Sequence, residues 1–334
     1  MTAPKKDFDF ARPKTIEQLY NLVQECQHEG RQFIFSAGGT DIMPRLKSEI
    51  LSPDVVISLT GLRALNNIEK HGNHIIIGAL TSLSDLCSNS HIQEYLPALA
   101  QAARKVASPQ IRNRATIGGN IMVENRCSYI NQSRLNRQSH SPCFKADGNI
   151  CHLVKSVKRG DDILCQARFV SDTAPILILQ GSTLDIIGPA GSKEIKLADL
   201  YLNDGIESKS LRHGEIITHI KVEITENSLS HYEKLTIRNA LDFPALGVAV
   251  LRRGNGDISV ALTGLNTRPG VFHAKPENHE TFDDMIADIC QKASDFTVTY
   301  QQDFFPRGYR KNMISVFIRR GINKILKGEK SCAM

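Results

Sequence analysis

The chain has 334 residues, of which 41% are apolar and 23% are charged, so it can form a large folded interior. No apolar run approaches the roughly eighteen residues that a membrane-spanning helix requires, and the sequence therefore predicts no membrane span. The net charge of +6 is modest for this length and the basic residues are scattered, which argues against nucleic-acid binding.

The beginning of the chain, MTAPKKDFDFARPKT, has neither an apolar core segment nor a small-residue cleavage site, so no secretory signal is expected there. A cytoplasmic location is the expectation, and the eight cysteines should then be reduced. In that compartment a cysteine cluster binds metal or carries out redox chemistry more often than it forms disulfides.

The first hundred residues alternate between helical and extended patterns. Apolar residues at helical spacing predict a helix between Thr15 and Gly30, and Thr15 with Gln18 fits a capping box. A short apolar strand, RQFIFSAGGT, runs into a glycine pair and a further helical segment. The strands DVVISLTGL and HIIIGAL follow, and then helices in LTSLSDLCSN and YLPALAQAARKVA. This alternation is typical of a small α/β unit.

The rest of the chain is richer in strands. The segment ATIGGNIM carries a second glycine pair, and a polar, cysteine-rich stretch comes directly after it. From Val170 onward, strands and turns are predicted in APILILQGSTLDII, KEIKLADLY, GEIITHIKVEI, YEKLTIRNALDFPALGVAVLRR and ISVALTGL. Amphipathic helices are predicted in TFDDMIADICQKASDF and YRKNMISVFIRRGINKIL. The apolar pattern breaks at Asn227 to Ser230, where we expect a domain boundary.

The two glycine pairs are the first candidate binding elements. Glycines that precede a helix leave backbone N–H groups exposed to a pyrophosphate. Neither pair belongs to a GxGxxG fingerprint or to a phosphate loop with GK[ST], which argues against both of those nucleotide-binding folds. One glycine pair alone is most often an ordinary tight turn. Two glycine pairs, each beside a short apolar strand, can bind one cofactor between them.

Several stretches together resemble the FAD-binding subunit of the molybdenum hydroxylases, the family that includes xanthine dehydrogenase and carbon monoxide dehydrogenase. They are SAGGTDIMPRLK, VASPQIRNRATIGGNI, SDTAP, YEKL followed by DFPALGVAV, and the terminal YRKNMISVFIRR. The resemblance covers nearly the whole chain and implies an α+β fold. A two-lobed FAD-binding domain of the vanillyl-alcohol oxidase/MurB-like (PCMH) type would occupy residues 1–226, with an iron–sulfur loop insertion at 122–168. A C-terminal domain of a small antiparallel sheet with helices would occupy residues 229–334.

The same resemblance implies that the diphosphate of FAD is held between the two glycine turns. Carried over residue by residue, the cofactor contacts fall on two runs and three single positions. They are Ile34, Phe35, Ser36, Ala37, Gly38, Gly39, Thr40 and Asp41, then Thr116, Ile117, Gly118, Gly119 and Asn120, and finally Val106, Asp172 and Lys234.

Some of these positions have a structural alternative. By position alone, Asp172 fits a cap on the turn before APILILQ, whereas the resemblance places it near ribose hydroxyls. Lys234 would ordinarily be a solvated strand lysine, but near a flavin it would stabilise the negative charge of the reduced ring. Arg112 and Arg114 fit phosphate contacts or a solvated loop equally well.

Four of the eight cysteines stand in the polar stretch, separated by 15, 7 and 13 residues: Cys127, Cys143, Cys151 and Cys165. They contain no CxxC pair, so a structural zinc site is the second choice. A 4Fe-4S cluster also takes four thiolates, and metal ligation would supply the order that this polar loop cannot obtain by burial. Four reduced cysteines without a metal remain the alternative.

Within the family, this loop is similar to that of the flavin subunit of 4-hydroxybenzoyl-CoA reductase, which carries an additional 4Fe-4S cluster. CSYINQS, SPCFK and CHLVK carry the similarity, and the first two cysteine intervals agree with it. KSVKRGDDIL lengthens the third interval, which leaves Cys165 the least secure ligand. His152 is expected to be a solvated loop residue. Packing or no role is expected for the remaining cysteines, Cys26, Cys87, Cys290 and Cys332.

The implied function is electron transfer, and no catalytic residue is predicted in this chain. By resemblance, FAD and the 4Fe-4S cluster pass electrons between a low-potential donor such as ferredoxin and two partner chains, a small 2Fe-2S subunit and a large molybdopterin subunit. The complex would be a dimer of heterotrimers. One alternative is the FAD subunit of an NAD-linked or other-acceptor dehydrogenase of the xanthine or aldehyde type. Others are a free-standing oxidase or cell-wall precursor reductase, and a zinc-stabilised binding protein without redox function.

Overall fold

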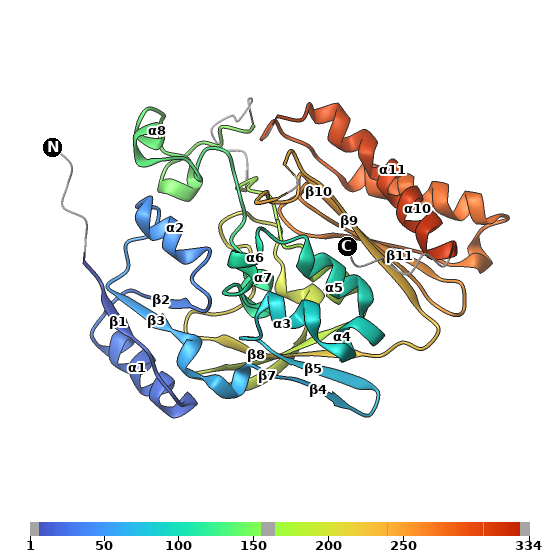
Figure 1. Ribbon diagram of the computed structural model, residues 1–334. Coiled ribbons are helices and arrows are strands. Elements are labelled where there is room, and N and C mark those ends of the chain that lie inside the picture. The colour runs from blue at the N-terminus through green and yellow to red at the C-terminus, as the bar shows by residue number, and fades with distance from the viewer. Residues whose placement is uncertain (1–6, 155–163, 239, 303, 328–334) are drawn as a thin grey trace.

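Three separate β-sheets follow one another along the chain, each with its own helices (Figure 1). The structure is a computed structural model that describes residues 7–154, 164–238, 240–302 and 304–327. Short 3-10 turns occur at Leu59–Gly61, Arg63–Leu65, Phe144–Ala146, Leu197–Leu200 and Pro276–Asn278.

The first sheet is parallel and has the strand order β1-β3-β2, with bounds Asp9–Ala11, Val55–Ser58 and Phe33–Ser36. Helix α1 (Ile16–His28) connects β1 to β2, and α2 (Ile42–Lys47) follows β2. The Thr15 hydroxyl accepts a hydrogen bond from the Gln18 amide at 3.2 Å, as the capping pattern predicts. The return bond comes from the Lys14 amide to the Gln18 side chain, so the capping box is only half formed. Gly30, with φ +68°, ends α1 as expected.

The second sheet is antiparallel and has the strand order β4-β5-β8-β6-β7. Its strands are β4 (Ile68–His71), β5 (His74–Gly78), β6 (Thr183–Gly188), β7 (Gly191–Lys196) and β8 (Ile216–Glu223). The segment HIIIGAL is a strand as predicted, but it pairs with β4 in a hairpin and does not belong to the parallel sheet. The expectation that the first hundred residues form one α/β unit is therefore wrong. The Gly-Asn dipeptide at the tip of this hairpin was the sequence signal for it.

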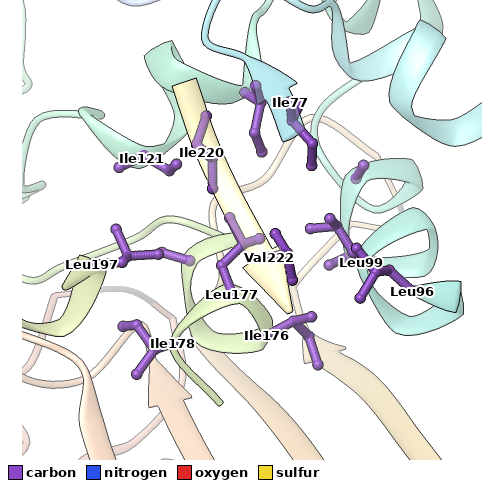
Figure 2. Packing of buried hydrophobic residues seen from close by; sticks show 14 of the residues in the cluster. Ile77, Leu96, Leu99, Ile121, Ile176, Leu177, Ile178, Leu197, Ile220 and Val222 are labelled. Carbon is purple, nitrogen blue, oxygen red and sulfur yellow. The ribbon is translucent and has the colours of Figure 1, made fainter. Parts of the chain in front are cut away.

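Short helices lie over the second sheet. They are α3 (Leu83–Ser88), α4 (Ser90–Tyr95), α5 (Pro97–Arg104), α6 (Pro109–Arg112), α7 (Ile117–Ile121) and α9 (Ala174–Leu179). The segment APILIL was predicted as a strand and is instead helix α9, with all six residues buried. An apolar run that is buried on every side shows neither helical nor strand periodicity, so the pattern could not separate the two. Figure 2 shows Ile176, Leu177 and Ile178 of α9 among side chains from α5 and β8.

The third sheet is antiparallel, with the order β12-β11-β10-β9. Its strands are β9 (Leu229–Leu235), β10 (Leu246–Arg252), β11 (Ile258–Thr263) and β12 (Gly270–Ala274). The two predicted C-terminal helices are present as α10 (Phe282–Phe296) and α11 (Arg307–Leu326), and they pack on one face of this sheet. The other face of the third sheet packs on α5 and α9, two of the helices that lie over the second sheet. Among the described residues, no helix is both long and apolar enough to cross a bilayer.

The cysteine-rich insertion leaves the body of the protein near α2 and contains one short helix, α8 (Arg134–Gln138) (Figure 1). Its two ends are joined by a pair of backbone hydrogen bonds between Arg126 and Arg168, each of 2.8 Å. Most of KSVKRGDDIL, the stretch that lengthens the third cysteine interval, lies outside the described residues.

Candidate functional site

The first glycine turn connects β2 to α2 and is held by a close backbone approach. A Cβ added at Gly38 would lie 1.8 Å from the carbonyl oxygen of Arg114, so no side chain fits there. Gly39 has φ +76°, in the left-handed region that glycine tolerates best. Both residues are therefore required by the geometry of the turn.

The second glycine pair lies within helix α7, so the short apolar strand expected beside it in ATIGGNIM is a helix instead. A Cβ on Gly118 would lie 2.7 Å from the Ala79 carbonyl oxygen. The Thr116 hydroxyl accepts a hydrogen bond from the Gly119 amide at 3.0 Å, which caps the helix. Because Gly38 packs on the segment immediately before Thr116, the two glycine elements lie side by side, as predicted for a shared cofactor.

A cavity of about 400 Å³ lies where the two glycine elements meet. Gly38 and Thr116 are the predicted cofactor contacts that line it. Arg114, which the sequence left open as a phosphate contact, lines it too. The remaining lining residues, which the sequence did not single out, are Thr60, Leu62, Arg63, Asn66, Leu80, Ser82, Ser84, Asp85 and Asn113. Two guanidinium groups and several hydroxyls can bind the oxygens of a diphosphate. The residues present thus fit an anionic dinucleotide.

Arg112 and Arg114, for which a phosphate contact and a solvated loop were both open, have different roles. Arg114 lines the cavity, and its backbone is the surface on which Gly38 packs. Arg112 donates a hydrogen bond of 2.8 Å to the carbonyl of Val106, so it stabilises its own loop. Val106 itself is half-buried against the core at the end of α5.

Asp172 and Lys234, predicted as separate cofactor contacts, form a buried ion pair with a separation of 3.1 Å. The Tyr232 hydroxyl donates to the other Asp172 oxygen at 2.7 Å, and Lys234 also donates to the Lys105 carbonyl at 2.9 Å. Burial raises the pKa of Asp172, although Lys234 and Tyr232 oppose this effect. Because the Lys234 side chain is only 5% exposed, the alternative of a solvated strand lysine is wrong.

The alternative of a capping role for Asp172 is wrong as well. The hydroxyl of Ser171 accepts the hydrogen bond from the Ala174 amide at 3.1 Å. Asn120 in α7 accepts from the hydroxyl of Ser171 at 2.8 Å and from that of Thr173 at 2.7 Å. Asn120 therefore ties the second glycine element to the SDTAP segment.

Other predicted contacts do not line the cavity. Asp41 lies at the start of α2, where its carboxylate pairs with Arg126 and approaches Arg45 at 3.8 Å. Ile34 and Phe35 are half-buried residues of β2, and Ser36 is buried at its end.

The four cysteines of the insertion line one pocket, although they are distant in sequence. Burial raises the pKa of Cys127, and it raises the pKa of Cys165 to about 11. Both groups are therefore neutral thiols at pH 7 unless a cation binds, and binding would release their protons. Cys165, expected to be the least secure ligand, lines the pocket with the other three.

No group of three or more His, Cys, Asp or Glu side chains within the described ranges is arranged to hold a metal ion as it stands. A single zinc ion requires its thiolates at about 2.3 Å from one point. The cysteine pocket thus offers no preformed site for a single ion.

His152 was expected to be solvated, and the structure differs. It is half-buried at the pocket, where it stacks on Tyr129 with ring centroids 4.5 Å apart. Its Nε2 lies 2.8 Å from the Ser141 carbonyl oxygen. Of the remaining cysteines, Cys26, Cys87 and Cys290 are buried, as their packing assignment predicts, and Cys332 lies outside the described residues.

Comparison with known proteins identifies the family. A family model described as the FAD binding domain in molybdopterin dehydrogenase matches residues 6–222. The chain belongs to this family. Glyceraldehyde dehydrogenase medium chain of Sulfolobus acidocaldarius is 24% identical over 96% of this chain and 98% of its own length. The aldehyde oxidoreductase FAD-binding subunit of Escherichia coli is 31% identical over 79% of this chain and 83% of its own.

Solved structures confirm the fold of this molybdopterin dehydrogenase FAD-binding chain. Carbon monoxide dehydrogenase from Oligotropha carboxidovorans superimposes with a TM-score of 0.74 at 20% identity, over 99% of this chain and 100% of the matched chain. The enzyme from Hydrogenophaga pseudoflava gives a TM-score of 0.73 at 21% identity, over 98% and 99%. The expected α+β architecture, an FAD domain followed by a sheet domain, is confirmed. The chain is an oxidoreductase subunit with an FAD-binding domain, as the resemblance implied.

Proposed function

We propose that this chain is the electron-transfer subunit of a molybdenum hydroxylase-type complex of the 4-hydroxybenzoyl-CoA reductase kind, with FAD and a 4Fe-4S cluster. The observation that carries the proposal is the single pocket lined by Cys127, Cys143, Cys151 and Cys165 in a chain of the FAD-binding family. When both groups are bound, the flavin exchanges one or two electrons and the cluster one, so the pair serves as an adaptor.

The flavin site in this proposal comprises residues 34–41, Val106, 116–120, Asp172 and Lys234. Arg63 and Arg114 supply positive charge at the cavity between the glycine elements, and Gly38 brings backbone close to the bound group. Lys234 is held in one position by Asp172 and by the Lys105 carbonyl, and in this proposal its ammonium group would stabilise the negative charge of a reduced flavin.

The cluster site uses the four cysteines as ligands. The absence of a preformed single-ion site among the described residues is compatible with this assignment, because four thiolates around a four-iron cube do not converge on one point. Lys145, from the same pocket, adds a positive charge beside ligands that become thiolates.

Domain limits and partners follow from the same proposal. The FAD domain comprises residues 1–226 with the insertion at 122–168, and the C-terminal domain comprises residues 229–334. The partners are a large molybdopterin subunit, a small 2Fe-2S subunit and a low-potential donor such as ferredoxin, assembled as a dimer of heterotrimers. Relatives such as the glyceraldehyde dehydrogenase medium chain are medium chains, which supports a complex with larger and smaller subunits.

Anaerobic purification followed by iron, acid-labile sulfide and flavin analysis tests the proposal. We expect about one FAD and about four irons per chain, with an absorption band that bleaches on dithionite titration. Colourless protein without iron, sulfide or extractable flavin would contradict it.

A cysteine variant assigns the iron to the pocket. Cys143→Ser should lose iron while some FAD remains, because the flavin contacts lie outside the insertion. Cys290→Ser is the matched control, since Cys290 is a buried cysteine of α10 far from the insertion in sequence, and it should retain full iron. Full iron in Cys143→Ser would remove Cys143 from the ligand set.

The second candidate function is the FAD subunit of an NAD-linked or other-acceptor dehydrogenase. It is favoured by the names of relatives such as the xanthine dehydrogenase FAD-binding subunit of Escherichia coli O157:H7, at 26% identity over 75% of this chain. NADH oxidation by the purified complex distinguishes the candidates. A ferredoxin-coupled reductase should not oxidise NADH, whereas an NAD-linked dehydrogenase should.

A further inference from the structure

A cluster of largely buried charges lies between the cysteine pocket and the first glycine turn, and its centre is Glu124, whose side chain is 23% exposed. One Glu124 oxygen accepts a hydrogen bond from Lys145, and the other lies 3.6 Å from the Arg45 guanidinium. Lys145 belongs to the insertion, two residues after Cys143, whereas Arg45 belongs to α2, directly after the first glycine turn. The side chains of Lys145 and Arg45 are only 10% and 12% exposed, so solvent screens these contacts little.

Lys145 is tied to the chain segments that carry the cysteines. It donates to the Asn125 carbonyl at 3.2 Å, two residues before Cys127, and to the Gly205 carbonyl at 2.7 Å. Gly205 lies against Cys165, since a Cβ added there would be 2.7 Å from the Cys165 sulfur. Lys145 therefore contacts the surroundings of three of the four cysteines, Cys127, Cys143 and Cys165.

Glu124 is charged in this setting. Burial acts to raise its pKa, but Lys145 and Arg45 hold the pKa of Glu124 below its ordinary value. A second contact runs in parallel, because Asp41 pairs with Arg126, the residue before Cys127. The insertion also touches the end of α2, where Arg137 of α8 donates to the Ser48 carbonyl at 2.7 Å.

We propose that Glu124 is a positioning residue that couples the two cofactor sites, so that filling the cysteine pocket strengthens flavin binding at the first glycine turn. The inference rests on the proposed function. Ligation of the four cysteines fixes the loop that carries Lys145, and Lys145 in turn fixes Glu124 and Arg45. Arg45 holds α2 and the turn before it in the arrangement that binds the cofactor. By linkage, bound flavin strengthens retention of the cluster by the same factor.

The test compares FAD dissociation constants of the full chain in its iron-loaded form and after anaerobic iron removal, measured by flavin fluorescence. In the wild-type chain, we expect iron removal to weaken FAD binding roughly tenfold, within the usual range of coupling between sites. In Glu124→Gln, the ratio of the two constants should fall close to one while iron still binds. A merely structural role would weaken FAD binding equally in both forms and would leave the ratio unchanged.

Glu215→Gln is the matched control, because Glu215 is also a buried carboxylate paired with a lysine, Lys193 at 2.7 Å, but it belongs to neither site. It should keep the wild-type ratio. Lys145→Gln removes the lysine of the same ion pair. If Glu124→Gln does not fold, the ratio of FAD dissociation constants is measured in Lys145→Gln instead.

The outcomes separate the two proposals. If the wild-type chain binds both iron and FAD, but its FAD dissociation constant is the same with and without iron, the coupling is overturned and the proposed function stays intact. The wild-type ratio persisting in Glu124→Gln and Lys145→Gln also overturns the coupling. A chain that binds no iron at all overturns the coupling and the proposed function together.

Discussion

The cavity where the two glycine elements meet, the cleft, differs from the cysteine pocket in what orders it. The cleft is lined mainly by turns, helix caps and 3-10 segments that lie against two large apolar cores, and its glycine elements are locked by backbone approaches such as that of Gly38 to Arg114. The cysteine pocket lies in a loop whose described part has one short α-helix, one 3-10 turn and few buried large apolar side chains, including Ile130 and Leu153. Burial thus orders the first region, whereas polar contacts and ligation order the second.

The largest effect is expected at the buried ion pair of Asp172 and Lys234. Lys234→Met leaves Asp172 buried without its cation, which should lower the free energy of unfolding by about 3–5 kcal/mol. Burial raises the pKa of Asp172 and Lys234 opposes this rise, so without Lys234 the folded variant binds a proton at Asp172 more readily than the unfolded chain, and the loss should shrink as the pH falls. Urea unfolding at two pH values measures this.

Lys221→Met is the control for that prediction. Lys221 pairs with Asp185 at 2.7 Å, but its side chain is 34% exposed, so the loss should be no more than about 1 kcal/mol. If both variants lose the same free energy of unfolding, burial of the Asp172–Lys234 pair does not add to its stabilising effect.

The next effect is expected at the first glycine turn. Gly38→Ala forces a methyl group against the Arg114 carbonyl and should cost about 3 kcal/mol, together with most FAD binding. Thermal unfolding and flavin content measure both losses. In Gly308→Ala, the added Cβ meets nothing within 4 Å in the first turns of α11, so this variant should be neutral or slightly stabilising. Retained flavin in Gly38→Ala would contradict the close approach.

A smaller and local effect is expected at the base of the cysteine loop. The buried Asn125 amide donates to the Ala167 carbonyl at 3.0 Å and to the Thr267 carbonyl at 2.7 Å, so Asn125→Ala leaves two acceptors unpaired at a cost of about 2 kcal/mol. Limited proteolysis should show faster cleavage between residues 127 and 167. Asn136→Ala, in the exposed helix α8, should not change the cleavage rate.

The smallest effect is expected where the loop touches α2 at the surface. Arg134→Gln removes a partly exposed ion pair with Glu49 and should change the free energy of unfolding by less than about 1 kcal/mol. Urea unfolding measures it. A loss comparable to that of Gly38→Ala would mean that the loop and the cleft share one core, against the contrast drawn above.

Part of the cleft was predictable, because Gly38 and Thr116 belong to local glycine motifs, but most of its lining residues were not predicted contacts. Gly38 and Gly39 predicted a tight turn. Elsewhere in the chain, the helix after Thr15 was predictable from its apolar periodicity and its N-cap. Tyr232 was missed because nothing in its neighbourhood marks a tyrosine that will reach Asp172, sixty residues earlier. Helix α9 was mistaken for a strand because complete burial removes the periodicity on which the prediction depends.

The sequence by itself determined the family, the α+β class, the two glycine elements and the set of four neighbouring cysteines, because each of these depends only on residue types and their spacing along the chain. Only the tertiary structure decided that the cysteines line one pocket, that Asp172 pairs with Lys234, and that Glu124 lies between Lys145 and Arg45. Contacts between residues so far apart in the chain depend on how whole elements pack, and local propensities carry no information about them.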